Sequence, residues 1–147
     1  MQAQAIETIS NNVLKYCDML CEALKDNYRE YSIRGHKRAI ANYDYTYDGS
    51  PSVQAQYHER CVNELKEGDL PINYVIESGK KYHKIIFVDS GNSRSAHAFV
   101  DKKTGEMYKS ASWKSPAKGV RYDLRLIEDR EYVLANCDWS GGYLYAR

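Results

Sequence analysis

Two runs decide the fold of this chain: Lys81-Tyr82-His83-Lys84-Ile85-Ile86-Phe87-Val88-Asp89 and Ser95-Ala96-His97-Ala98-Phe99-Val100-Asp101. Both runs are rich in the β-branched and aromatic residues that favour strands. Glycine-containing turns before and after them lead to shorter runs of the same kind at residues 73–77 and 106–110. The sequence therefore predicts an antiparallel β-meander of about four to five strands.

Alternation along these runs assigns the side chains to two faces of the predicted sheet. We expect one face to be apolar and covered by helices, with Tyr82, Ile86, Val88, Ala96, Ala98, Val100 and Met107. The opposite face then carries His83, Ile85, Phe87, His97, Phe99, Tyr108 and Ser110. Because that second set mixes imidazoles, rings and hydroxyls, it indicates either a half-covered sheet or part of a binding surface.

Residues N-terminal to the meander carry two helical patterns. Between about Ala5 and Leu24 apolar residues recur every three or four positions, namely Ile6, Ile9, Val13, Tyr16, Cys17, Leu20 and Leu24. Ser52 caps a second expected helix through about Lys66, with the stripe Val53, Tyr57, Cys61 and Leu65, and Gly68 ends it. We thus predict an α+β fold with two N-terminal helices packed on one face of the sheet.

The segments around these elements are less regular. Residues 26–51 lose the helical pattern and include a basic cluster at 34–38, which we interpret as solvated, and alternating Tyr43, Tyr45 and Tyr47, which favour a short strand. Near the C-terminus the pattern predicts a short helix around 128–136, and the tail from Asp138 indicates a turn followed by a final short strand.

Length and charge limit the function classes. The 147 residues fit a single domain, 1–147, in which 1–72 are mainly helical and 73–147 hold the sheet, a cationic loop and the tail. A net charge of +1 provides no global attraction to nucleic acid or an anionic membrane. Since neither a signal peptide nor an apolar run long enough to span a bilayer is evident, we expect a cytoplasmic protein without membrane contact.

Cysteines are the only residues whose pattern raises the question of a metal. Cys17 and Cys21 lie four apart on the first expected helix, and His36 could join them in a zinc site. Cys61 and Cys137 are scattered, and no CxxC pair occurs. Free cysteine is among the most buried residue types, so we expect core thiols, no metal and no cofactor.

The segment from Tyr108 to Tyr122 concentrates cations, hydroxyls and rings, and we call residues 110–119 within it the cationic loop. Pro116 and Gly119 shape such a loop, while lysines, arginine and hydroxyls are the usual means of holding phosphate and aromatic rings can stack on a base. With the two strand histidines added, the expected ligand-binding residues are Tyr108, Ser110, Ser112, Trp113, Lys114, Ser115, Lys118, Arg121, Tyr122, His83 and His97.

A resemblance is carried by three stretches: Ala98–Lys109, its continuation Ser112-Trp113-Lys114-Ser115-Pro116-Ala117-Lys118-Gly119-Val120-Arg121, and the ending Asp138-Trp139-Ser140-Gly141-Gly142-Tyr143-Leu144-Tyr145. They resemble small, mostly uncharacterised proteins of tailed bacteriophages, including cyanophages. The resemblance implies a viral origin and the cytoplasm of an infected host cell, but no established activity. Small phage proteins of this kind include nucleotide sponges, nucleic-acid binders and inhibitors of host defence enzymes.

Three functions follow from these patterns. The first is a non-enzymatic protein that holds a signalling nucleotide or a nucleic-acid backbone on the cationic, aromatic segment from Tyr108 to Tyr122, in the context of host defence evasion. The second is a protein inhibitor of a host enzyme, because the 14 tyrosines suit an interface. The third is a small enzyme with His83 and His97 as an acid/base pair. No Walker A, GxGxxG, HExxH or GxSxG motif occurs, so we favour binding over catalysis and leave homo-oligomer formation open.

Overall fold

The computed structural model describes residues 2–43 and 49–145, with side chains from residue 12 onward. Residue contacts divide the chain into two compact units. The sheet unit comprises residues 1–25 and 72–147, and the helical unit comprises residues 26–71. The sheet begins at Asn73, and helix α1, Gln2–Asn42, runs through both units.

Helix α1 is much longer than its apolar stripe. Within the sheet unit the expected positions Val13, Cys17, Leu20 and Leu24 are fully buried. The sequence analysis predicted irregular structure after Leu24, and that prediction was wrong, because α1 continues unbroken to Asn42 past Gly35. Polar helix-forming residues and the pairs Lys25–Glu22 and Arg29–Asp26 stabilise this continuation locally.

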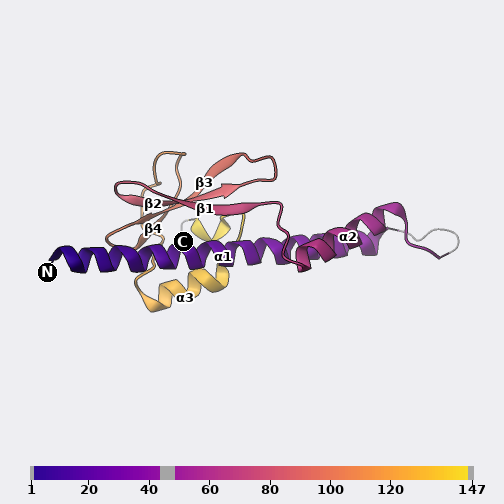
Figure 1. Cartoon of the computed structure of the whole chain (residues 1–147), viewed down its shortest axis with the longest axis horizontal. Coiled ribbons are helices and arrows are strands. Elements are labelled where there is room, and N and C mark those ends of the chain that lie inside the picture. Colours follow the sequence, from indigo (N-terminus) through magenta and orange to yellow (C-terminus); the bar gives the residue numbers. More distant parts are fainter. Residues whose placement is uncertain (1, 44–48, 146–147) are drawn as a thin grey trace. The chain divides into compact units, whose positions relative to one another are not determined.

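The sheet is a five-stranded antiparallel meander in chain order (Figure 1). Its strands are β1 (Asn73–Ser78), β2 (Tyr82–Val88), β3 (Arg94–Asp101), β4 (Glu106–Lys109) and β5 (Tyr122–Asp123). Helix α3, Ile127–Asn136, follows, and the chain closes with the 3-10 turn η1, Gly142–Leu144. The α+β class and the antiparallel meander are therefore confirmed; the tail forms η1 rather than the expected strand.

The register corrects the predicted faces of the sheet. Ala98 lies opposite Ile85 and Val100 lies opposite His83, while Ile86 lies opposite Ala96. The pairing shifts between Ile85 and Ile86, so that one residue of β3, His97, forms a bulge. A bulge reverses the alternation of side chains beyond it. The sequence analysis assumed an uninterrupted period of two, so it wrongly assigned Ile86 to the same face as Ala98 and Val100, and Phe99 to the same face as His83.

The helix-covered face carries the main core. Ile85, Ala98, Val100 and Met107 are fully buried there, and the cross-strand neighbour of Met107, Tyr122, stacks on Tyr132 of α3. Figure 1 shows the first half of α1 running along the sheet, with α3 beside it. On the other face Lys84, paired with Phe99, lies 3.8 Å from the Trp113 ring, so the cationic loop covers part of that face.

The helical unit contains the second half of α1 and helix α2, Val53–Lys66. Ser52 caps α2 by accepting a hydrogen bond from the Ala55 backbone N–H (3.1 Å), and Gly68, at a φ of +105°, follows its end as expected. The predicted stripe was right for Leu65, which is buried, but wrong for Val53, which is 80% exposed, and for Tyr57, which is exposed. The other buried residues of α2 are Ala55 and Val62. Tyr45 and Tyr47 of the expected strand lie outside the described residues.

The burial of the cysteines and the hydropathy of the helices can also be compared with what the sequence predicts. Cys17, Cys21 and Cys137 are buried, as predicted for core thiols, and Cys61 is half-buried. A search of the described helices finds none with a stretch both long and apolar enough to cross a bilayer.

Candidate functional site

The cationic loop is held in shape by its own hydrogen bonds. Ser110 and Pro116 form an isolated bridge, and the Ala117 N–H donates to the Lys109 carbonyl (2.7 Å). The Ser112 and Ser115 hydroxyls lie 3.0 Å apart, and Ser112 Oγ also accepts from the backbone N–H groups of Lys114 and Ser115. These two serines therefore stabilise the loop itself.

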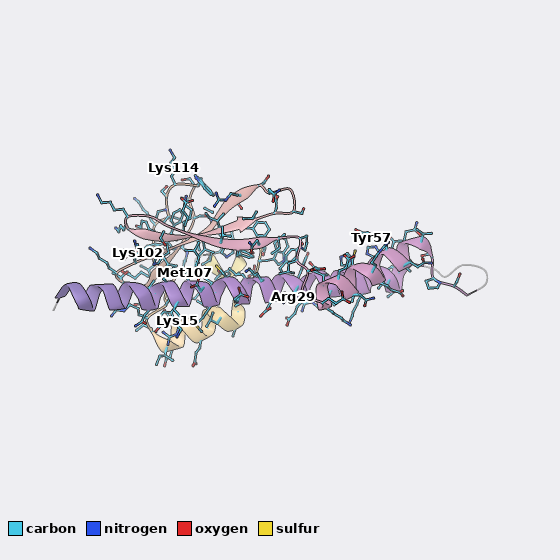
Figure 2. The ribbon with its side chains drawn as sticks, viewed as in Figure 1. Lys15, Arg29, Tyr57, Lys102, Met107 and Lys114 are labelled. Atoms are coloured by element: carbon cyan, nitrogen blue, oxygen red, sulfur yellow. The ribbon has the colours of Figure 1, made fainter. Side chains whose placement is uncertain are left out.

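The Trp113 ring lies close to two cationic side chains, those of Lys84 and Arg94. Trp113 is 38% exposed, with Lys84 Nζ 3.8 Å and the Arg94 guanidinium carbon 5.7 Å from the ring centroid. Glu77 lies 3.9 Å from both Lys84 and Arg94, so part of their charge is balanced. Lys114 and Lys118 are exposed, as predicted. Figure 2 shows Lys114 extending from the outer end of the loop.

Arg121 and Tyr122 belong to the attachment of the C-terminal segment. Arg121 donates from Nε to the Leu144 carbonyl (2.6 Å) and from one terminal nitrogen to the carbonyls of Lys118 and Gly119 (3.2 and 2.8 Å). The Tyr122 hydroxyl donates to the Tyr143 carbonyl (2.7 Å), and its side chain is buried. Arg121, which was expected to contact phosphate, is therefore bound to backbone carbonyls, and Tyr122, which was expected to stack on a base, is buried.

Asp138 organises the turn that follows α3. Its carboxylate accepts hydrogen bonds from the Ser140 hydroxyl (2.5 Å) and from the backbone N–H groups of Gly142 and Tyr143 (3.0 and 3.1 Å). Although partial burial acts in the opposite direction, these bonds lower the pKa of Asp138. Gly141 adopts a φ of +83°, a conformation that favours glycine, so the local sequence determines this turn.

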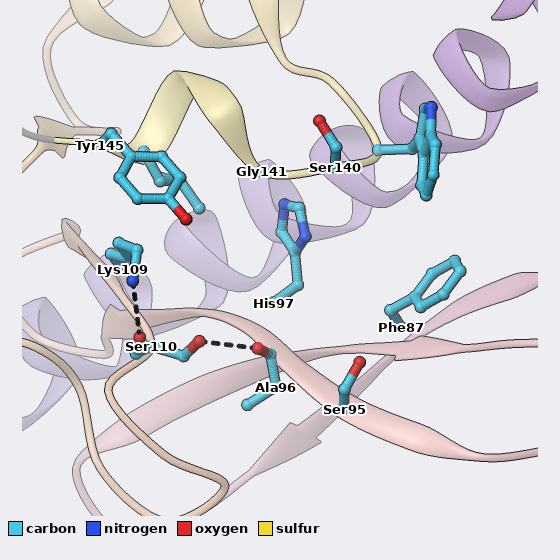
Figure 3. Close-up of a pocket in the computed structure, with 11 residues that line it drawn as sticks. Phe87, Ser95, Ala96, His97, Lys109, Ser110, Ser140, Gly141 and Tyr145 are labelled. Carbon is cyan, nitrogen blue, oxygen red and sulfur yellow. Dashed lines mark hydrogen bonds between the residues drawn. The ribbon is translucent and has the colours of Figure 1, made fainter.

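A cavity of about 380 Å³ lies between this turn and the sheet (Figure 3). Strands β2, β3 and β4 supply one wall and the C-terminal segment supplies the other. The lining residues are Phe87, Ser95, Ala96, His97, Lys109, Ser110, Trp139, Ser140, Gly141, Leu144 and Tyr145. This volume lies within the range of small-ligand pockets.

Lys109 supplies the positive charge among these lining residues. Its Nζ is 4.9 Å from the centroid of the Tyr145 ring and 3.4 Å from the Ser110 carbonyl oxygen. Ser110 Oγ donates to the Ala96 carbonyl (2.8 Å), which leaves its lone pairs available as acceptors. Figure 3 shows Lys109, Ser110 and Tyr145 grouped at one end of the cavity and Phe87 at the other.

His97 stands between the two ends. Its Nε2 shares a hydrogen bond of 2.8 Å with the Tyr143 hydroxyl, and Tyr74 packs edge-on against its ring. Burial lowers the pKa of His97 to about 4, although the negative charge of Asp138 acts to raise it, and burial raises the pKa of Tyr143 well above its usual value. Both side chains are therefore neutral at pH 7.

The structure separates the other expected site residues. His83 is buried, with its Nδ1 2.8 Å from Ser78 Oγ, so the two histidines of the supposed acid/base pair contact different partners. Tyr108 is half-buried and meets Tyr82 edge-on. Of the predicted residues, His97 and Ser110 line the cavity. The sequence analysis placed Phe87 on the mixed face of the sheet but did not include it, Ser95 or the tail residues from Trp139 to Tyr145 among the ligand-binding residues.

Comparison with known proteins identifies the family but assigns no activity. No curated protein and no solved structure matches the chain significantly. A family model described as a family of unknown function (DUF7717) matches residues 1–146. Because the match extends over nearly the whole sequence, the chain belongs to the DUF7717 family.

Proposed function

We propose that this protein is a non-enzymatic binding protein that holds a small phosphate-bearing ligand with an aromatic base, a nucleotide, in the cavity between β3, β4 and the C-terminal segment. The observation that carries the proposal is the composition of the cavity wall. One cation, three serine hydroxyls and several rings line it, and no carboxylate is among the described lining residues. Such a wall suits an anion attached to a planar group.

The phosphate belongs at the end with Lys109. A lysine ammonium is a compact charge that binds phosphate, and the Ser110 and Ser140 hydroxyls can complete the contacts. Because Lys109 is the single cation among the lining residues, the site favours one phosphate group over a triphosphate.

The base belongs at the end with Phe87 and Trp139. These rings lie 6.5 Å apart between centroids at an angle of 39°, and stacking on such rings contributes about 1 to 3 kcal/mol per base. The neutral His97 can add a hydrogen bond without competing for the phosphate charge. The cationic loop and the neighbouring Arg121 are the weaker candidate, because Ser112 and Ser115 bond to each other and Arg121 is bound to backbone carbonyls.

The test compares two lysines. Nucleoside monophosphates, nucleoside triphosphates and a short oligonucleotide are titrated into the Trp113→Phe protein, in which Trp139 is the remaining tryptophan and reports on the cavity. Lys109→Ala removes a charged contact of about 1.5 to 3 kcal/mol, so we expect binding of a monophosphate to weaken about tenfold to a hundredfold. Lys114→Ala is the matched control and should bind like the parent protein.

Two results would contradict the proposal. If no member of the panel alters Trp139 fluorescence or produces heat in calorimetry, the cavity does not hold nucleotides. If Lys114→Ala weakens binding while Lys109→Ala does not, the ligand binds to the cationic loop. A role in evading host defence and a cytoplasmic setting in an infected cell are part of the proposal too, and they rest on the phage-like stretches of the sequence alone.

A further inference from the structure

The helical unit contains a pair of histidines in direct contact. His36 on α1 and His58 on α2 approach with their Nδ1 atoms 2.8 Å apart, and their ring planes are tilted by 44°. Both side chains are half-buried. The pair lies far from the cavity in the sequence and plays no part in the proposed function.

Aromatic neighbours fix the orientation of these rings. The Tyr43 ring stacks on His58, with 5.6 Å between centroids and 17° between planes. The Tyr57 ring meets both imidazoles edge-on, at 6.4 Å from His36 and 5.1 Å from His58. A site whose ligands are already oriented loses little conformational entropy on binding.

The distance between the two nitrogens limits what they can hold. At 2.8 Å they can share one proton, in which case at least one ring is neutral. They can also be neighbouring ligands of one metal ion. With metal–nitrogen bonds of about 2.0 to 2.1 Å, a separation of 2.8 Å gives an angle of about 85° at the metal. This angle is near the right angle of square-planar and tetragonal coordination and smaller than that of a tetrahedron.

We propose that His36 and His58 form a two-nitrogen site for a divalent transition metal with tetragonal preference, Cu²⁺ or Ni²⁺, that replaces the shared proton and links α1 to α2. Imidazole suits both ions, and Cu²⁺ has the highest affinity in the first-row divalent series.

His36 also lines a groove of about 380 Å³, together with Tyr57, Cys61 and Glu64 among other residues. No set of three or more His, Cys, Asp or Glu residues suited to a metal occurs among the described residues, so water completes the coordination. The site is therefore open to exchange. Because Ala55, Val62 and Leu65 are the buried residues of α2, a link between the helices adds support where the packing is thin.

The test uses the full chain with CuCl2 and NiCl2 as probes. We expect one Cu²⁺ per chain, an electron paramagnetic resonance spectrum with hyperfine splitting from two imidazole nitrogens, and a rise in the thermal midpoint of helix loss. His36→Gln and His58→Gln should each weaken Cu²⁺ binding at least tenfold and leave one nitrogen. His36→Gln/His58→Gln is the matched control for Cu²⁺ held by His83, His97 or the backbone.

Circular dichroism of each variant without metal verifies that the helices form. The proposal is overturned if wild type binds Cu²⁺ no better than the folded double variant, or if the two-nitrogen spectrum persists in the double variant. It is also overturned if wild type selects Zn²⁺ over Cu²⁺ and Ni²⁺, because that preference would indicate tetrahedral coordination. Nucleotide binding at the cavity should be unchanged in these variants, so either proposal can fail alone.

Discussion

The sheet unit and the helical unit share helix α1 but use it differently. In the sheet unit Val13, Cys17, Leu20, Cys21 and Leu24 are buried, whereas no residue of α1 between 26 and 42 is buried. The first half of the helix is stabilised by packing against the sheet. The second half depends on polar side-chain pairs, worth about 0.2 to 0.5 kcal/mol each, and on α2. A continuous helix can thus join a well-packed unit to a thinly packed one.

The largest expected effect tests that difference directly. Leu24, in the sheet unit, is fully buried, so Leu24→Ala should cost about 2 to 5 kcal/mol of unfolding free energy. Leu65→Ala, in the helical unit, should leave the unfolding of the sheet unit unchanged. Both tryptophans, Trp113 and Trp139, lie in the sheet unit and report on it by fluorescence, while far-UV circular dichroism reports on all helices.

Urea titrations followed by both signals measure this prediction. The two signals should separate in Leu65→Ala, with helix loss at lower urea, and coincide in Leu24→Ala. Equal shifts of the fluorescence midpoint in the two variants would mean that the two units unfold together.

The second prediction concerns stability at acidic pH. The free energy of unfolding of the sheet unit should fall by up to about 3 kcal/mol on acidification because of one histidine. The pKa of His97 is about 4 in the folded protein, below the ordinary value of 6.5, so the unfolded chain takes up the proton more readily. The stabilisation that the neutral His97 contributes to the folded protein is fully present above pH 6.5 and is lost as the pH falls toward 4. Tyr143, Tyr74 and the carboxylate of Asp138 are the titratable groups around it.

The measurement is the free energy of unfolding by tryptophan fluorescence between pH 7 and pH 4. His97→Gln should give a flatter dependence over this range, because glutamine cannot take up the proton but can still bond to Tyr143. An unchanged slope in the variant would show that other groups cause the acid sensitivity.

The third prediction compares Arg121, which attaches the C-terminal segment, with Lys118, which lies in the cationic loop. Arg121 donates to the carbonyls of Leu144, Lys118 and Gly119, so Arg121→Ala should destabilise the sheet unit by about 1.5 to 3 kcal/mol. Lys118→Ala, an exposed neighbour, should change stability by less than about 0.5 kcal/mol. Thermal melts compare the two; equal melting temperatures for Arg121→Ala and wild type would contradict the attachment role.

Sequence patterns alone predict the meander, the N-terminal cap of α2, its end at Gly68 and a helix close to α3, because each depends on local signals: alternation, capping hydroxyls and glycine. The continuation of α1 beyond Leu24 was also within reach of the sequence, since residues 26–42 contain no proline and carry charges at helical spacing. The continuation was missed because the apolar stripe ends at Leu24, whereas the helix ends at Asn42.

The faces of the sheet and the candidate site depend on contacts that form only in the folded chain. A single extra residue at His97 shifts the register, and no local pattern marks it, since a bulge depends on pairing with β2. The different roles of Arg121 and Lys109 also depend on tertiary contacts. Their sequence neighbourhood is equally cationic, yet the docked C-terminal segment binds Arg121 to Leu144 and leaves Lys109 in the cavity wall. Charge is visible in a sequence, but its partners are set by segments that meet only in the folded chain.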